Sequence, residues 1–273
     1  MHRWIAPIAA ASLSAGLNAI TFAGDLPASA PGYTKAPIAL PRSWSGFYLG
    51  LNAGGEWGRN DPTLSVSDGA FFGTAGPPFI TAAGSRSFNN SGVTAGAQVG
   101  YNWQWNTMVM GLESDFGYFQ PKGSIATSGS FPAATTFALT ENSSADWLFT
   151  FRPRVGVAIN NWLLYGTGGV AISNLKFNEA FGGSSAGGAS SQAISLSQTK
   201  AGWAAGGGVE YGMTRNWSLR GEYLHLQFDG ISGASALCAP APACTSVPSH
   251  IFNQQSGSFR EDVVRGGINY KLD

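Results

Sequence analysis

Apolar and polar residues alternate with a period of two through most of the chain beyond residue 44. The alternation is clearest over residues 93–104, where Val, Ala, Tyr and Trp take the odd positions and Thr, Gly, Gln and Asn take the even ones. Such a period is that of a β-strand whose two faces meet different surroundings. It predicts eight strands, at about residues 47–56, 93–104, 110–118, 146–157, 161–177, 200–211, 217–223 and 264–272. The fifth is apolar on both faces, so its inward face stays unassigned.

The two faces of these strands differ in a way that bears on their surroundings. One face carries Val, Leu, Phe and Met and ends in aromatic residues, whereas the other is rich in Gly, amides and charges. A soluble sandwich would bury the apolar face and wet the polar one. Glycine suits the narrow interior of a small barrel and aromatic strand ends suit a bilayer interface, so the pattern favours a membrane barrel with a polar lumen. The aromatic residues concerned are Trp103, Trp105, Tyr118, Trp147, Trp162, Trp203, Trp217 and Tyr270.

Short and long connections alternate strictly between the predicted strands. Residues 105–107, 160–161 and 214–216 make short links of the hairpin type, while residues 58–92, 120–144, 178–199 and 230–258 make long ones. A chain threaded through a membrane gives this order, with tight turns on the periplasmic side and long loops outside. The sequence therefore predicts an all-β fold: an eight-stranded antiparallel transmembrane up-and-down β-barrel in the outer membrane of a Gram-negative bacterium, with four long extracellular loops.

Composition agrees with a chain that meets lipid over much of its surface. Only 11% of residues are charged, against about a quarter in a soluble domain. There are 38 glycines, 9 Trp, 8 Tyr and 17 Phe. The formal net charge of +0 gives no electrostatic reason to expect nucleic acid as a partner.

The first 43 residues are predicted to be export and linker segments. Residues 1–23 have a basic start, a short apolar run and the ending Thr21-Phe22-Ala23, which together predict a cleaved signal peptide. A membrane anchor is the alternative, which Pro7 and Gly16 within the apolar run disfavour. Residues 24–43 are rich in proline and predict a periplasmic linker. The barrel domain is therefore predicted to cover residues 44–273.

Charged residues on the predicted inward face nearly balance, with five acids and six bases. An eight-stranded barrel is just wide enough for side chains to fill it. Buried charges must pair there, because an unpaired one costs several kcal/mol. We therefore expect a plug of salt bridges, with a narrow pore for ions or small solutes as the alternative. The residues are Glu56, Glu113, Asp115, Arg152, Arg154, Lys200, Glu210, Arg220, Glu222, Arg265 and Lys271.

The long loops hold the remaining candidate features. Cys238 and Cys244 are predicted to form a local disulfide, with two free thiols as the alternative. A G-x-S-x-G string at residues 183–187 lies in a low-complexity loop, and no His, Cys or carboxylate cluster has metal-ligand spacing. The sequence thus predicts no catalytic, cofactor-binding or metal site, and no enzyme. Six apolar loop residues would either pack the loops together or form a contact surface: Phe71, Phe72, Phe79, Ile80, Phe131 and Phe137.

Several strand motifs resemble those of the alphaproteobacterial outer-membrane immunogenic protein family, whose members have a small barrel of the OmpA type. The W-S-G-F-Y-L-G sequence at residues 44–50 carries the resemblance. Later motifs extend it over the mature chain except the long loops; they lie at residues 100–104, 111–115, 154–156, 165–171, 202–211 and 222–224. The resemblance implies a monomeric eight-stranded surface antigen with a role in envelope integrity and with no catalytic residues.

The C-terminal strand departs from this family in one respect. Members usually end in an aromatic residue that the barrel-assembly machinery recognises, whereas this chain ends in Leu272-Asp273. Either Leu272 serves instead or assembly is less efficient. The expected partners are that machinery, outer-membrane lipid and lipopolysaccharide. The expected function is structural and surface-interacting; the alternatives are a porin-like pore and a loop-borne binder of a small ligand such as haem.

Overall fold

The computed structural model describes residues 42–69, 71–131, 135–185, 188–245 and 250–272. The predicted signal peptide, and all but the last two residues of the predicted linker, lie outside these ranges. None of the described helices is long and apolar enough to cross a membrane.

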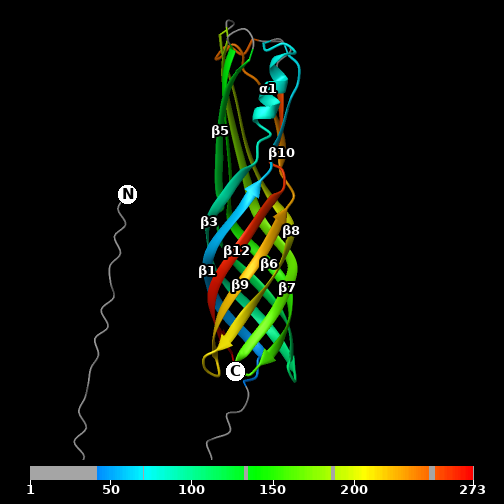
Figure 1. Cartoon of the computed structure of the whole chain (residues 1–273), viewed down its shortest axis with the longest axis vertical. Helices are drawn as coiled ribbons and strands as arrows, with labels where there is room; N and C mark the ends of the chain where they lie inside the picture. The colour runs from blue at the N-terminus through cyan, green and yellow to red at the C-terminus, as the bar shows by residue number, and fades with distance from the viewer. Residues whose placement is uncertain (1–41, 70, 132–134, 186–187, 246–249, 273) are drawn as a thin grey trace, which may run out of the picture. The chain divides into compact units, whose positions relative to one another are not determined.

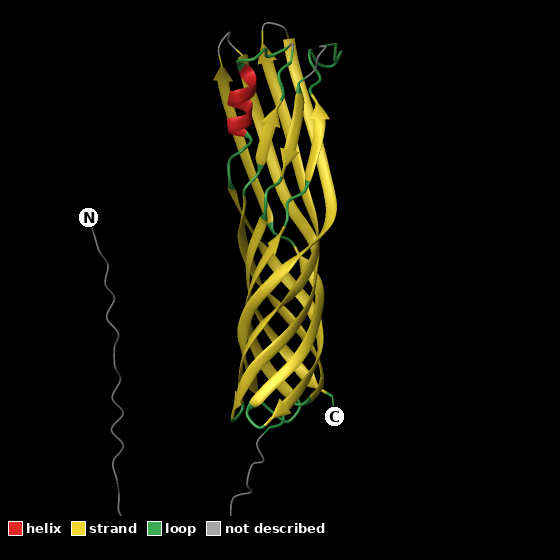
Figure 2. Cartoon of the chain, turned by 90° about the vertical axis from the view of Figure 1, so that its right-hand side faces the viewer, coloured by secondary structure: helices red, strands yellow, loops and turns green. Residues whose placement is uncertain are grey.

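Eight antiparallel strands close into a barrel (Figures 1 and 2). The ring closes because the first strand pairs with the last on one side and with its next barrel neighbour on the other. The predicted fold class is confirmed. The barrel strands are β1 (Gly46–Asn60), β3 (Phe88–Trp105), β4 (Met108–Phe119), β6 (Thr135–Ile159), β7 (Trp162–Ser185), β8 (Gly188–Gly212), β9 (Trp217–Phe228) and β12 (Phe259–Lys271).

Tight turns join strands at the end of the barrel where β1 begins and β12 ends. Asn106 (φ 52°) lies between β3 and β4, and Asn160 (φ 54°) lies between β6 and β7. Asparagine adopts this left-handed backbone more readily than most residues, and two-residue hairpins need it. The short connections lie at this end, as the alternation of short and long connections predicts, and we call it the periplasmic end after that prediction.

The outer face of the barrel is an apolar belt with aromatic residues at both edges. Its middle exposes aliphatic side chains such as Leu51 (64% exposed) and Val93 (61%). On β7, the strand with two apolar faces, Leu163 and Tyr165 point inward and Leu164 points outward. The aromatic residues at the outer edge are Trp57, Tyr118, Trp147, Trp203 and Tyr223, and those at the periplasmic edge are Trp105, Trp162, Tyr211, Trp217 and Tyr270.

Three strands run far beyond the length needed to cross a bilayer. β6, β7 and β8 have 25, 24 and 25 residues, whereas a membrane strand needs about 9–11. Beyond the outer aromatic edge they continue, joined by β5 (Lys122–Phe131), as a sheet whose outer face is mainly Ser, Thr, Ala and Asn. We call this sheet the extension: β5 with residues 135–145, 174–185 and 188–200. Most of the residues expected in the second and third long loops are thus strand.

A small sheet and a helix cover the inner face of the extension. The strands β10 (Ser232–Ala236), β11 (Ile251–Gln255) and β2 (Thr63–Val66) pair with one another, and α1 (Gly76–Ala83) packs on β2 and β5. The upper apolar cluster fills the space between these layers. It comprises Leu64, Val66, Phe72, Ile80, Ala83, Phe137, Leu139, Phe181, Leu237, Ala239 and Phe252.

Three of the six apolar loop residues singled out in the sequence belong to this cluster. Phe72, Ile80 and Phe137 are buried in it, so they pack the loop segments on one another. Phe71 lies against the cluster and Phe79 is 49% exposed. The side chain of Phe131 is outside the described part of the chain.

A register shift on β6 changes the face of one acid. The pairing between β6 and β7 shifts between Ala145 and Leu148. Leu148 keeps the inward parity of Thr150, whereas before the shift Ala145 is buried and Asp146 lies on the outer surface in an ion pair with Lys176. A strict period of two from Thr150 and Arg152 predicts Asp146 on the inward face, and this prediction is wrong because a β-bulge interrupts the period.

Candidate functional site

The lumen of the membrane-spanning barrel holds an ionic network centred on Arg152. This guanidinium is fully buried (0% exposed) on the inward face of β6. Its Nη2 atom lies 2.9 Å from Glu113 Oε1 and 2.8 Å from Asp115 Oδ2, both on the neighbouring strand β4. Its Nη1 atom lies 3.4 Å from Glu222 Oε1 on the far wall, in β9. One arginine thus joins opposite sides of the barrel.

Two further arginines complete the same network from the β9–β12 wall. Arg220 Nη2 donates to Glu113 Oε1 at 2.7 Å and also pairs with Glu222. Arg265 Nη1 lies 3.1 Å from Asp115 Oδ1, and its Nη2 lies 2.7 Å from Glu222 Oε2. Each carboxylate is therefore shared by two or more guanidinium groups, which fixes the two walls at a set separation.

Arg154 lies one step closer to the periplasm and is held by aromatic rings as well as by acids. Its guanidinium carbon is 4.5 Å from the ring centre of Tyr48 and 5.2 Å from that of Tyr165. Its Nη1 is 3.3 Å from Glu210 Oε2. The Tyr48 hydroxyl donates to Glu113 Oε2 at 2.6 Å. A cation between two rings is stabilised by their π faces, so this layer adds attraction beyond ion pairing.

The network is electrically balanced, with four acids and four bases. All eight side chains are 5% exposed or less: Glu113, Asp115, Glu210, Glu222, Arg152, Arg154, Arg220 and Arg265. Removing one partner from such a cluster leaves an uncompensated buried charge, which is far more costly than replacing a whole pair. The arrangement therefore fixes which strands are neighbours and in what register.

The other three predicted lumen charges lie outside the network. Glu56 is buried nearer the extracellular end, where its Oε1 accepts a hydrogen bond from the backbone N–H of Gln120 at 3.0 Å. Lys200 is only half-buried, opposite Ser173. Lys271 is half-buried at the periplasmic end and donates from Nζ to the carbonyl oxygen of Ser43. The structure thus brings together eight of the eleven residues.

An apolar cluster lies across the lumen on the extracellular side of the network. This lower apolar cluster comprises Phe88, Phe119, Ala145, Leu148, Ala171, Leu175, Phe177, Ala204, Leu224, Leu226, Phe228, Ile231, Phe259 and Val263. Every barrel strand except β1 contributes to it, and Phe119 and Phe259 are each 1% exposed. A hydrated ion would have to pass this cluster as well as the charges.

Two buried acids in the extension were missed in the sequence. Glu141 and Glu179 are 1% and 2% exposed, between the lower and upper apolar clusters. Burial raises the pKa of Glu141 to about 8, and Glu179 opposite adds to this rise. Burial also raises the pKa of Glu179 to about 7. The inward residues Phe137, Leu139 and Glu141 have the same period of two as the barrel strands. The residues between them, Ala138 and Thr140, are small, so the alternation is weak and the sequence predicts a loop for this segment.

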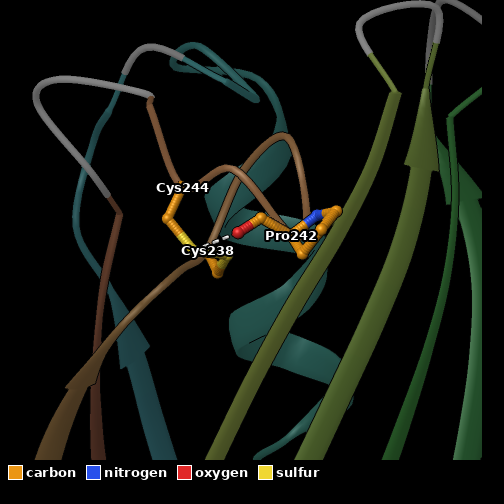
Figure 3. Close-up of a disulfide and its surroundings, with 3 residues drawn as sticks. All are labelled: Cys238, Pro242 and Cys244. Carbon is orange, nitrogen blue, oxygen red and sulfur yellow. Dashed lines mark hydrogen bonds between the residues drawn. A yellow bond between two sulfur atoms is a disulfide. The ribbon is translucent and has the colours of Figure 1, made fainter.

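The cysteine pair closes a small ring at the tip of the extension. Cys238 and Cys244 are joined by a disulfide, with their Cα atoms 4.3 Å apart (Figure 3). The ring is fastened to β8, because the backbone N–H of Cys238 donates to Ser191 O at 2.8 Å. Cys244 Sγ also lies 3.4 Å from the carbonyl oxygen of Pro242. The ring therefore orders a proline-rich segment that has no strand of its own.

His225 sits at the outer edge of the belt, near the end of β9. Its Nδ1 lies 2.8 Å from Asp262 Oδ1, and the Tyr223 hydroxyl donates to the same oxygen at 2.6 Å. The contact with Asp262 gives His225 a structural role at the rim of the barrel. Throughout the described ranges, no group of three or more His, Cys, Asp or Glu side chains is arranged to hold a metal ion.

The chain matches known proteins over most of its length. The family model for the outer membrane protein beta-barrel domain matches residues 26–237. This chain belongs to that family. The 31 kDa outer-membrane immunogenic protein of Brucella melitensis is 33% identical over 220 residues, which are 79% of this chain and 84% of that protein. The 22 kDa outer membrane protein of Rhizobium leguminosarum is 31% identical over 194 residues, 71% and 69% of the two chains.

Solved structures match this chain at much lower sequence identity. Neisserial surface protein A matches with a TM-score of 0.32 and 12% identity, over 84% of this chain and 98% of that one. The family match and the curated relatives place this protein in the outer membrane. The predicted resemblance to outer-membrane immunogenic proteins and the predicted location are confirmed.

Proposed function

We propose that this outer-membrane barrel passes no solutes, strengthens the envelope and presents the extension as its contact surface for other molecules. The balanced lumen network is the observation that carries the proposal. Arg152, which has no exposed surface, contacts acids on two opposite walls. Ions would have to break several buried pairs and then cross the lower apolar cluster, and both steps are costly.

Recording from planar bilayers tests the closed lumen. Purified protein, folded in detergent and checked by anomalous migration on unheated gels, is expected to give no steady conductance above that of detergent alone. A stepwise, reproducible open conductance would contradict the proposal and support the alternative of a narrow porin-like channel. No residue of the lumen is assigned a catalytic role in this proposal.

The extension is the part through which the protein would contact its surroundings. Its outer face carries small polar residues rather than the apolar residues of the belt, so water or sugar, not lipid, suits it. Protease applied to intact cells is expected to cut at the tips of the extension and to leave a protected barrel fragment. Cutting within β1 or β12 on intact cells would contradict this orientation.

The partners that this function requires are lipids and the assembly apparatus. The apolar belt fits outer-membrane lipid, with lipopolysaccharide around the aromatic outer edge. The C-terminal strand β12 closes the ring against β1, where Lys271 is paired with Tyr48. We propose that the barrel-assembly machinery recognises this strand and that the folded protein is a monomer, because closure leaves no barrel strand unpaired.

A further inference from the structure

Two buried carboxylates face each other in the extension, outside the membrane-spanning part. Glu141 on β6 and Glu179 on β7 are directly paired residues of adjacent strands. Side chains in such positions have Cβ atoms about 4.5–5.5 Å apart, and like charges there repel. The two acids are enclosed between the lower and upper apolar clusters, so water does not screen them.

No basic side chain in the described part of the protein compensates this pair. The pKa of Glu141 is raised by burial and by Glu179, and only the amide of Gln254 opposes the rise. The pKa of Glu179 is raised by burial, and only Gln192 opposes it. Within the described chain, no Lys or Arg contributes to either value. In the lumen network, by contrast, every acid forms an ion pair with at least one arginine.

Two buried amide side chains adjoin the acids and leave oxygens free. Gln254 on β11 is 1% exposed and donates from Nε2 to Glu141 Oε1 at 2.9 Å. Gln192 on β8 is 5% exposed and donates from Nε2 to Ser235 on β10. Among the described residues, neither amide oxygen has a hydrogen-bond partner, and the same holds for Glu141 Oε2 and for both carboxylate oxygens of Glu179. The site therefore presents five buried oxygens that accept nothing.

Buried oxygens without partners are unfavourable, and a cation would satisfy them. Carboxylate and amide oxygens in groups of six to eight, often completed by water, are the ligands of calcium. Magnesium needs a stricter octahedron and releases its water reluctantly, which suits an enclosed site less well. Transition metals prefer imidazole and thiolate, and the four side chains of this site offer neither.

We propose that Glu141, Glu179, Gln192 and Gln254 bind one divalent cation of the calcium class. The four residues come from β6, β7, β8 and β11, so the cation ties the extension to the small sheet that covers its inner face. The bound cation would lie between the two apolar clusters and would stabilise the packing of the small sheet against the extension. The site would take its cation from the medium outside the cell.

Equilibrium dialysis with calcium chloride alone tests the site. The full mature chain is refolded in detergent free of lipopolysaccharide, since that lipid binds calcium itself. We expect one saturable site per chain with a Kd of about 1 mM or below, within the range of extracellular calcium modules. The double variant Glu141→Gln/Glu179→Gln should bind at least about tenfold more weakly. Asp146→Asn, which removes an exposed acid of the same strands, should bind as the parent does.

Binding that is absent at about 10 mM calcium, or unchanged in the double variant, would overturn the proposal, as would tighter binding of magnesium than of calcium. If the double variant does not fold, the parent protein still provides a test. At pH 7 calcium must displace protons from carboxyls whose pKa lies at about 7 and 8. Calcium added to weakly buffered protein should therefore release protons, and an absence of release would also count against the site.

Discussion

Arg152 on β6 and Glu222 on β9 lie on opposite walls of the barrel, yet their Nη1 and Oε1 atoms are 3.4 Å apart. Replacing the arginine by alanine leaves three acids with less compensation. We expect Arg152→Ala to lower the free energy of unfolding by about 3–5 kcal/mol, measured by urea titration of the refolded barrel. Arg152→Lys keeps the charge and should lose less. Equal midpoints for the parent and Arg152→Ala would show that the network is not stabilising.

Gly100 on β3 has no room for a side chain. A Cβ atom there would collide with the Tyr48 hydroxyl and lie 2.7 Å from Leu112 O. Gly100→Ala should therefore displace Tyr48 from Glu113 and destabilise the barrel by about 1–3 kcal/mol. Gly221→Ala is the matched control, because the nearest atom to its Cβ is 3.9 Å away. The same denaturation midpoint for both variants would contradict this account.

The ring between Cys238 and Cys244 should matter locally and leave the barrel unaffected. A disulfide that closes so short a loop is worth about 2 kcal/mol in the chain-entropy model. We expect Cys238→Ser/Cys244→Ser to make the segment between β10 and β11 more sensitive to proteinase K on intact cells. Migration of the unheated barrel on gels should not change. Loss of the folded band would mean that the ring is needed for barrel folding itself.

The raised pKa values of Glu141 and Glu179 predict a pH effect on the extension when divalent cations are removed with EDTA. The ordinary pKa of 4.5 applies in the unfolded chain, whereas burial raises the folded values to about 8 and about 7. The folded state therefore binds more protons between these values, and stability falls as pH rises from about 4.5 to 8. Glu179 on β7 and Gln254 on β11 are the polar groups that act on the pKa of Glu141, and Gln192 on β8 acts on that of Glu179.

Hydrogen exchange of residues 136–145, corrected for intrinsic rates, measures this effect. Exchange should accelerate between pH 5 and pH 8 (about the window above), and calcium should slow it again. Glu141→Gln should flatten the profile. A profile that is flat in the parent protein would contradict the assigned direction of the shift.

The last residues of β12 complete the ring. Tyr270 is paired with Leu49 and Lys271 with Tyr48, and Leu272 N–H donates to Phe47 O at 2.8 Å. Deletion of residues 270–273 should block insertion, because the closing pairs and the strand end offered to the assembly machinery are both lost. The level of folded protein in isolated outer membranes measures this. Normal levels of the truncated chain would show that recognition lies elsewhere.

Local alternation was enough to predict the barrel and most of its lumen. Arg152 and Arg154 lie an even number of residues from Thr150, so the period of two places all three inward. The acids Glu113 and Asp115 lie on the preceding barrel strand, β4, which pairs with β6. The bulge at Ala145 could not be read in this way, because an inserted residue has no signature of its own there. The Glu141 site depends on Gln254, more than a hundred residues away, and such a contact follows from tertiary packing alone.

The extension determines which part of the protein an approaching molecule contacts first. β6 continues for twelve residues from Trp147 to Thr135, about 40 Å at the rise of a strand. An antibody, phage or host molecule approaching from outside reaches the tips before it reaches the headgroups of the bilayer. Changes of sequence at those tips are separated by the whole extension from Arg152 and its partners. The surface that other organisms encounter can therefore diversify while the part that must fold in the membrane stays the same.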